Sequence, residues 1–508
     1  MRGRKNEKRV IIEWLNLTWR FFHLQVSDKL ICGSVYDYLS TRIMTGLLSD
    51  GEKLPSILEL SDAFHLAPET IRAALLILAE DGYIRMEAKQ GSWVTYQADR
   101  AAREEAVARY YAQRCDGIQD LRRSAPYLLE PLLTHALREM DDSCRTRLRE
   151  NWEAGRKDQI ISPAIRLCAL LLSVLNNSLI LNLFWEVDRY LRFSCLSVSD
   201  AYDAVASAMF QNDRDNEAGR SDKVLYDAGG TIRQIIGICH EARGRYPAEE
   251  QVPFHWTIYR QRRQLCYTLA ARIIRKIPAG VYPIGSYLPP LPKMAEELDV
   301  SVRTLRRTLS ILSSLGVTRS FHGKGTLVCM EAEDIEFSRP EIKEGLRYYW
   351  ESLQFLSLTA GPVSLHMLRT MPEADSDSLT AQFNEMCERD RCHRCFDIVL
   401  NFIAERCPLA MVRECYGALQ EFLAWGYPFT VHRLRNHSLQ SEYAQTIGQA
   451  ADCLTHRDWE GFSGKFGALM AREARLAEMI LTDYCKQSPS GDGENISPEI
   501  TDTIEVHP

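Results

Sequence analysis

Apolar residues recur at helical spacing between residues 35 and 81. Tyr36, Leu39 and Ile43 lie at i, i+3 and i+7 of a first predicted helix, and Gly46 ends it. Residues 57–66 predict a second short helix. Ala67-Pro68 opens a third, since proline suits the first helical turn. The inward face of this third helix is predicted to be Ile71, Ala74, Leu75 and Leu78.

The spacing changes after Gly82, which is predicted to stop the third helix together with Asp81. Residues 83–86 and 92–96 predict two short strands, joined by a turn through residues 89–91. Three short helices followed by a hairpin predict a winged helix-turn-helix module.

The same pattern returns in the second half of the chain without a gap. Residues 46–94 and 280–328 share thirteen identities in 49 positions, four of them glycine pairs. At a spacing of 231, Pro131, His135, Leu137, Arg138 and Met140 match Pro362, His366, Leu368, Arg369 and Met371. The chain is therefore predicted to be two copies of one unit, each a winged-helix module followed by a helical one.

Three stretches carry a family resemblance: GEKLPS (51–56), TIRAALLIL (70–78) and QGSWV (90–94). They resemble the GntR-type winged-helix DNA-binding domain, and the second copy repeats them as GSYLPP, TLRRTLSIL and KGTLV. The resemblance implies that the third helix enters the DNA major groove, where arginine and threonine reach phosphates and base edges. The predicted DNA contacts are Ser56, Glu69, Thr70, Arg72, Gln90, Gly91, Ser301, Arg303, Thr304, Arg306, Arg307, Lys324 and Gly325.

Both copies depart from the family pattern. Leu58 and Pro292 stand where such domains usually place an arginine in the second helix, and neither third helix opens with the usual Ser-Arg. The third helix of the first copy carries Glu69 beside Arg72, whereas the second carries three arginines. The second copy is therefore predicted to bind phosphate more strongly. The first is predicted to read another sequence, to bind weakly or to be structural, and the alternative for either arginine face is a solvated helix surface or a salt bridge.

Residues 100–245 and 335–485 follow a helical period. Their layout is similar to the all-helical effector domain of the FadR-like branch of the family. Many members of that branch hold a metal with one Asp and three His. The central-helix ligand position falls near Arg166 and Asp397, so we predict no metal site and no cofactor. Candidate residues for binding a small-molecule effector are His135, Asn176, Asn177 and His366, with caps or core hydrogen bonds as the alternative.

Cys387, Cys392 and Cys395 follow a spacing that resembles zinc or iron–sulfur ligation, with Cys407 as a fourth candidate. They lie in a helical stretch and have no counterpart in the first copy, which favours free thiols. All fifteen cysteines are interpreted as reduced thiols of a cytoplasmic protein.

The net charge of −7 means that nucleic-acid binding would need local basic faces. Residues 167–185 form a long uncharged run, but Asn176, Asn177 and Ser178 interrupt it. We interpret the run as two buried helices joined by a turn rather than a membrane span.

The predicted fold class is mainly α: two winged helix-turn-helix domains, each followed by an all-helical bundle. The predicted boundaries are a basic arm and helix (1–28), the first winged helix (29–98), the first bundle (99–245), a linker (246–258), the second winged helix (259–332), the second bundle (333–485) and a disordered acidic tail (486–508).

These features predict a bacterial, cytoplasmic, sequence-specific transcription regulator. Its predicted partners are double-stranded DNA and a small-molecule effector, with no membrane, and it would act as a homodimer or as an internal pseudo-dimer. The alternative is a protein-interaction scaffold, which the acidic net charge and the missing arginines favour. An enzyme is not predicted, because no nucleophile–base or metal constellation stands out.

Overall fold

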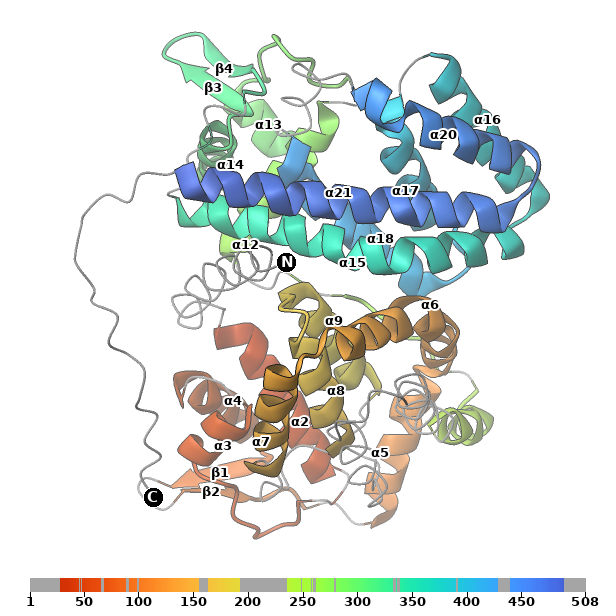
Figure 1. The fold of residues 1–508 in the computed structure, drawn as a ribbon. Coiled ribbons are helices and arrows are strands. Elements are labelled where there is room, and N and C mark those ends of the chain that lie inside the picture. Colours follow the sequence, from red (N-terminus) through yellow and green to blue (C-terminus); the bar gives the residue numbers. More distant parts are fainter. Residues whose placement is uncertain are drawn as a thin grey trace.

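The computed structural model of the chain is mainly α-helical, with two small antiparallel hairpins (Figure 1). It describes residues 28–487, with gaps at 45, 47, 65–67, 88–90, 98–99, 155–162, 192–234, 248, 257, 259–261, 278–279, 332–334, 336–338, 390–391 and 428–438. The predicted N-terminal arm and acidic tail lie almost wholly outside the described residues.

The first winged-helix module contains the predicted three helices and hairpin. They are α2 (Asp28–Met44), α3 (Ile57–Phe64), α4 (Pro68–Glu80), β1 (Ile84–Glu87) and β2 (Gly91–Val94). The predicted inward face of α4 is confirmed, since all four of its members are at most 1% exposed. A reciprocal capping box starts α3: the Glu59 N–H donates to Ser56 Oγ (3.2 Å) and the Ser56 N–H donates to Glu59 Oε2 (2.6 Å).

The second winged-helix module repeats this order. Its elements are α12 (Arg262–Lys276), α13 (Leu291–Glu297), α14 (Val302–Ser314), β3 (Thr318–Phe321) and β4 (Gly325–Val328). Each hairpin also gains a bridge from the segment before the second helix, Lys53 to Trp93 in one module and Tyr287 to Leu327 in the other. Gly82 and Gly316 have φ of 78° and 70°, in the left-handed region that glycine favours, which explains one of the glycine pairs in the repeat.

The helical modules also repeat. The first bundle contains α5 (Arg100–Ala112), α6 (Cys115–Glu139), α7 (Asp142–Ala154), α8 (Pro163–Ser173), α9 (Ser178–Leu191) and helical residues 235–245. The second contains α15 (Pro340–Thr370), α16 (Glu373–Glu388), η5 (Cys392–Arg394), α17 (Cys395–Arg406), α18 (Ala410–Leu423), η6 (Ala424–Gly426), α20 (Leu439–Thr455) and α21 (Trp459–Gln487). Helices α6 and α15 end at Glu139 and Thr370, and α7 and α16 begin at Asp142 and Glu373, so both pairs keep the spacing found in the sequence.

The two bundles contact each other. Helix α6 packs against α15 and α18, and α15 also contacts α9. In Figure 1 the first half of the chain lies below the second, and α15 runs beside α21 along the length of the second bundle.

The uncharged run at 167–185 forms parts of α8 and α9, separated by a turn in which Asn176 adopts φ of 48°. The predicted pair of helices is therefore confirmed. Within the part of the chain that the structure describes, no helix combines the length and the apolar character needed to cross a membrane.

The described apolar residues form two separate cores. The first winged-helix module has its own small core, which includes Leu39, Ile71 and Leu78. A second core runs without interruption through the first bundle, the second winged-helix module and the second bundle. Tyr267 of α12 illustrates this continuity, because its ring packs edge-on against the ring of Trp425 of η6, with 5.5 Å between the ring centroids.

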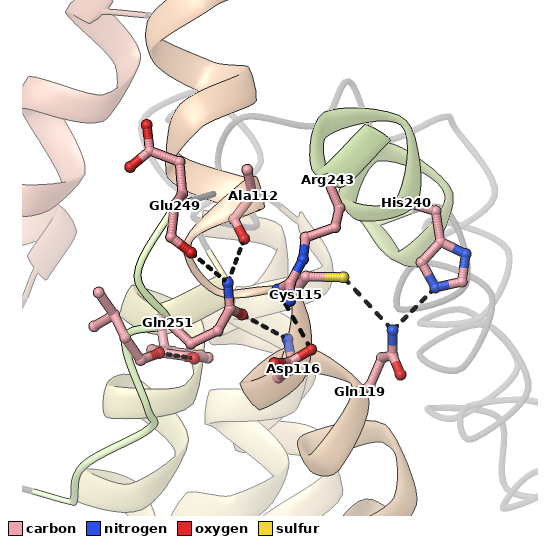
Figure 2. A network of polar contacts seen from close by, with 10 residues as sticks. Ala112, Cys115, Asp116, Gln119, His240, Arg243, Glu249 and Gln251 are labelled. Carbon is pink, nitrogen blue, oxygen red and sulfur yellow. Dashed lines mark hydrogen bonds and ion pairs between the residues drawn. The ribbon is translucent and has the colours of Figure 1, made fainter. Parts of the chain in front are cut away.

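The described residues of the predicted linker (246–258), which are 246–247, 249–256 and 258, include several that pack against the first bundle (Figure 2). The Gln251 amide bridges the break between α5 and α6. Its Nε2 donates to the Ala112 carbonyl (2.8 Å), and its Oε1 accepts from the Asp116 N–H (3.1 Å). Figure 2 also shows Gln119 of α6 directed at the His240 ring, 3.0 Å away. This segment therefore closes the first bundle.

Candidate nucleic-acid interface

Helix α14 is the third helix of the second winged-helix module, and it is fixed from its inner side. Leu305, Leu309 and Leu312 are buried against the continuous core. Ser301 caps the helix, accepting the Thr304 N–H at its Oγ (3.1 Å). The opposite side of α14 is therefore held in a defined orientation toward solvent.

That outer side carries positive charge. Arg303, Arg306 and Arg307 are exposed, and the helix contains no acidic residue. No described acidic side chain forms an ion pair with Arg303 or Arg306. Lys293 of α13 is also exposed and lies 3.9 Å from Glu297. We name the surface formed by Lys293, Arg303, Arg306 and Arg307 the cationic face.

Arg303 lies in the first turn of α14, where the positive end of the helix dipole disfavours a cation. Its presence there does not stabilise the helix. A phosphate near that turn would interact favourably with both the positive end of the helix dipole and the guanidinium. The position therefore fits anion binding better than it fits helix stability.

The wing of the same module adds a further cation. Lys324 is exposed in the tight turn between β3 and β4, and its N–H donates to the Phe321 carbonyl (3.2 Å). Gly323 and Gly325 on either side have φ of 72° and 102°. These glycines give the turn a narrow tip at which backbone and ammonium group can approach a duplex together.

The corresponding surface of the first module has a different character. Helix α4 carries one basic residue, Arg72, and two acidic residues, Glu69 and Glu80, and all three are exposed. Three large apolar side chains of this module are also exposed: Leu58 on α3 is 67% exposed, and Leu76 and Ile77 on α4 are 50% and 40% exposed. We name Leu58, Leu76 and Ile77 the apolar face. At the equivalent positions the second module has Pro292, Ser310 and buried Ile311.

Several predicted contact residues also stabilise the modules. Ser56 is the helix cap described above, and its N–H and hydroxyl hold the pKa of Glu59 below its usual value. The Thr304 hydroxyl lies 2.8 Å from the Ser301 hydroxyl. Gly91 and Arg72 are exposed. Gln90 and the side chain of Thr70 lie outside the described residues.

The candidate effector residues are not gathered around one site. Asn177 is buried: its Oδ1 caps the Ile180 N–H (2.9 Å), and its Nδ2 donates to the Glu351 carbonyl (2.9 Å) and to Gln354 Oε1 (2.8 Å). His366 stacks on Tyr127 at 4.2 Å. Asn176 forms the exposed turn, and His135 is half-buried on α6. Asn177 and His366 thus stabilise the contact between the two bundles.

The structure offers no metal centre in its described part, where no three His, Cys, Asp or Glu side chains form a group that could hold an ion. Among the described residues, Cys387, Cys392, Cys395 and Cys407 form no disulfide. Burial raises the pKa of the Cys387 and Cys407 thiols to about 11.

Two features were missed from the sequence. Lys293 stands where the first module has Glu59, and comparing the two copies for charge as well as identity would have found it. Asp120 and Glu351 are acidic residues at equivalent positions of the repeat, each bonded to the opposite half. The sequence shows the spacing of the repeat, but it does not show that these two residues contact the opposite half.

Comparison with known proteins gives a family match for both winged-helix modules. The family described as "Bacterial regulatory proteins, gntR family" matches residues 32–94 and again residues 266–328. No curated protein matches the chain.

Two solved structures that are similar to this chain are the following. Streptococcus agalactiae GntR is 16% identical, with 41% of this chain and 99% of that chain covered and a TM-score of 0.18. E. coli McbR/YncC is 13% identical, with 43% and 96% covered and a TM-score of 0.24.

Proposed function

Because the chain carries two winged-helix domains of the GntR family of bacterial regulatory proteins, we propose that it is a sequence-specific DNA-binding transcription regulator. The observation that carries the proposal is the cationic face on α13 and α14, three arginines and a lysine on a helix-turn-helix held by a buried inner side. In a winged helix this surface faces the major groove. Arg303 at the first turn would bind phosphate, Arg306 and Arg307 would contact phosphate or guanine, and Lys324 would lie beside the neighbouring groove.

The two modules take unequal parts in this proposal. The second module supplies the main electrostatic attraction. The first would contribute a weaker or differently specific contact through Arg72. Two unlike readers in one chain suit a non-palindromic site, and their linkage raises the effective concentration of the weaker one.

Selection of bound fragments from sheared genomic DNA, followed by titration of the selected duplex, tests the proposal. Arg303→Ala with Arg306→Ala is expected to weaken binding and to reduce the salt dependence by about one ion for each phosphate that is no longer neutralised. Arg369→Ala is a matched control. Arg369 is an exposed arginine near the end of α15. It lies about 40 Å along that helix from Pro340, the first residue of α15, at 1.5 Å per residue. Equal binding by the double variant and the control would reject the proposal.

Protein binding is a second candidate function for the first module alone. The apolar face and Glu69 of the same module favour it, because exposed leucines suit a protein surface better than a phosphate backbone. DNase footprinting distinguishes the two. The test variant combines Leu58→Pro with Leu76→Ser, which introduces the residues found at the equivalent positions of the second module. If this variant leaves the DNase protection of the duplex unchanged, a protein partner is favoured.

Control by a small molecule in the bundles is proposed from their layout alone. Thermal unfolding of the full chain against a panel of organic acids and sugars tests it. A ligand that raises the unfolding temperature and also changes DNA affinity would support effector control.

A further inference from the structure

The contact between the two bundles contains a pair of matching helix caps. The carboxylate of Asp120 on α6 accepts the N–H groups of Ala410 (2.9 Å) and Met411 (2.7 Å) at the start of α18. The carboxylate of Glu351 on α15 accepts the N–H of Leu179 (3.2 Å) and the hydroxyl of Ser178 (2.6 Å) at the start of α9. Each carboxylate lies in one half of the chain and caps a helix of the other half.

The two caps are equivalent under the internal repeat. Asp120 and Glu351 are separated by the repeat spacing of 231, and so are Leu179 and Ala410. Asp120 of the first half thus contacts Ala410 of the second half. Its counterpart Glu351 contacts Leu179, which is the counterpart of Ala410. This reciprocity defines the interface of a two-fold symmetric dimer. Here it occurs inside one chain.

The residue of the second half that precedes α18 cannot replace the cap from Asp120. The residue before α18 is Leu409, whose side chain cannot accept a hydrogen bond, and no side-chain cap from that position is formed. The first N–H groups of a helix need acceptors, and the positive end of the dipole favours a carboxylate there. The second half therefore depends on the first for the start of α18.

The reverse cap is more deeply buried. Glu351 is 1% exposed and Asn177 is 0% exposed, and Asn177 binds the carbonyl of the same Glu351. Arg347, one turn before Glu351, lies 3.8 Å from its carboxylate. Buried polar groups that are satisfied in only one arrangement fix the register of the surfaces that carry them.

We propose that these reciprocal caps make the two halves a built-in dimer, so that one copy of the chain is the complete DNA-binding unit. The DNA part of this statement rests on the proposed function, whereas the built-in dimer does not.

Sedimentation equilibrium of the full chain tests the assembly. A mass of 58.2 kDa without DNA, and one chain per duplex with it, is expected. A particle of twice that mass would overturn the proposal. A single-copy protein that binds no DNA would leave the built-in dimer standing and reject only the proposed function.

Hydrogen exchange tests the caps directly. Asp120→Ala is expected to speed exchange of the Ala410 and Met411 amides, which lie in the other half, on the order of tenfold. Asp120→Asn, which keeps one oxygen acceptor, should restore part of the protection. Asp141→Ala is the matched control, because Asp141 caps α7 within its own half through the Cys144 N–H (2.7 Å). It should affect α7 alone. Unchanged exchange at Ala410 and Met411 in Asp120→Ala would remove the basis of the proposal.

Discussion

The charge difference between the two third helices can be tested by exchanging one pair of equivalent residues. Arg303 of α14 and Glu69 of α4 occupy the same position of the repeat, and both are exposed in the first turn of their helix. Arg303→Glu gives the second module the residue of the first, and Glu69→Arg does the reverse. Neither side chain belongs to a core, so both variants are expected to fold.

The size of the effect follows from the two charges involved. Losing one charge-assisted contact to a phosphate costs about 1.5 kcal/mol. A glutamate about 6 Å from that phosphate adds a repulsion of about 0.7 kcal/mol in water. Arg303→Glu should therefore weaken binding by about 2 kcal/mol, or roughly 30-fold. Glu69→Arg removes the same repulsion and adds one contact to a phosphate, so it should tighten binding by about 2 kcal/mol, or roughly 30-fold, if the first module also lies against the duplex.

Fluorescence anisotropy with a labelled duplex, repeated between about 50 and 200 mM salt, measures both quantities. The slope of log K against log salt should fall by about 0.9 in Arg303→Glu and rise by a similar amount in Glu69→Arg. Arg389→Glu is the control for overall charge, because Arg389 is an exposed arginine directly after α16 and pairs with Glu385. An Arg303→Glu variant that matches this control in affinity and slope would refute the assignment of the cationic face.

Three further predictions concern stability. Burial raises the pKa of Asp188 to about 7, and its buried Oδ1 has no hydrogen-bond partner among the described residues. Between about pH 4 and 7 the Asp188 carboxyl therefore keeps its proton in the folded chain and loses it in the unfolded chain. Stability should therefore fall as pH rises from about 4 to 7, and Asp188→Asn should flatten that dependence in urea titrations. Leu305→Ala, at a fully buried position of α14, should cost about 2–5 kcal/mol by the same titration. Gly345→Ala should cost about 1–3 kcal/mol in the second bundle, because a Cβ there would overlap the ring of Trp425; an unchanged unfolding midpoint would contradict that packing.

The winged-helix modules were predictable because their signals are local. The inward face of α4 follows from helical spacing, and the glycine pairs mark turns that need positive φ. The two helices around Asn176 were equally accessible, since polar residues interrupt an apolar run. Each of these signals lies close in the sequence to the structure that it specifies.

The contacts between the halves could not be predicted in the same way. Asp120 reads as one exposed acid on an amphipathic helix, and its partners Ala410 and Met411 lie in the other half of the chain. Gln251 reads as a polar linker residue, yet it closes the break between α5 and α6. Such roles depend on which surfaces meet, and hydrophobic periodicity carries no information about that.

The continuous core has a consequence for how control could reach DNA. The side chains behind the cationic face belong to the same packed interior as Trp425 and the second bundle, so a rearrangement of that bundle would be transmitted directly to α14. The first module has its own interior and would be largely insulated from such a change. Regulation and strong phosphate binding would then reside in the same half, leaving the other half free to diverge under separate selection.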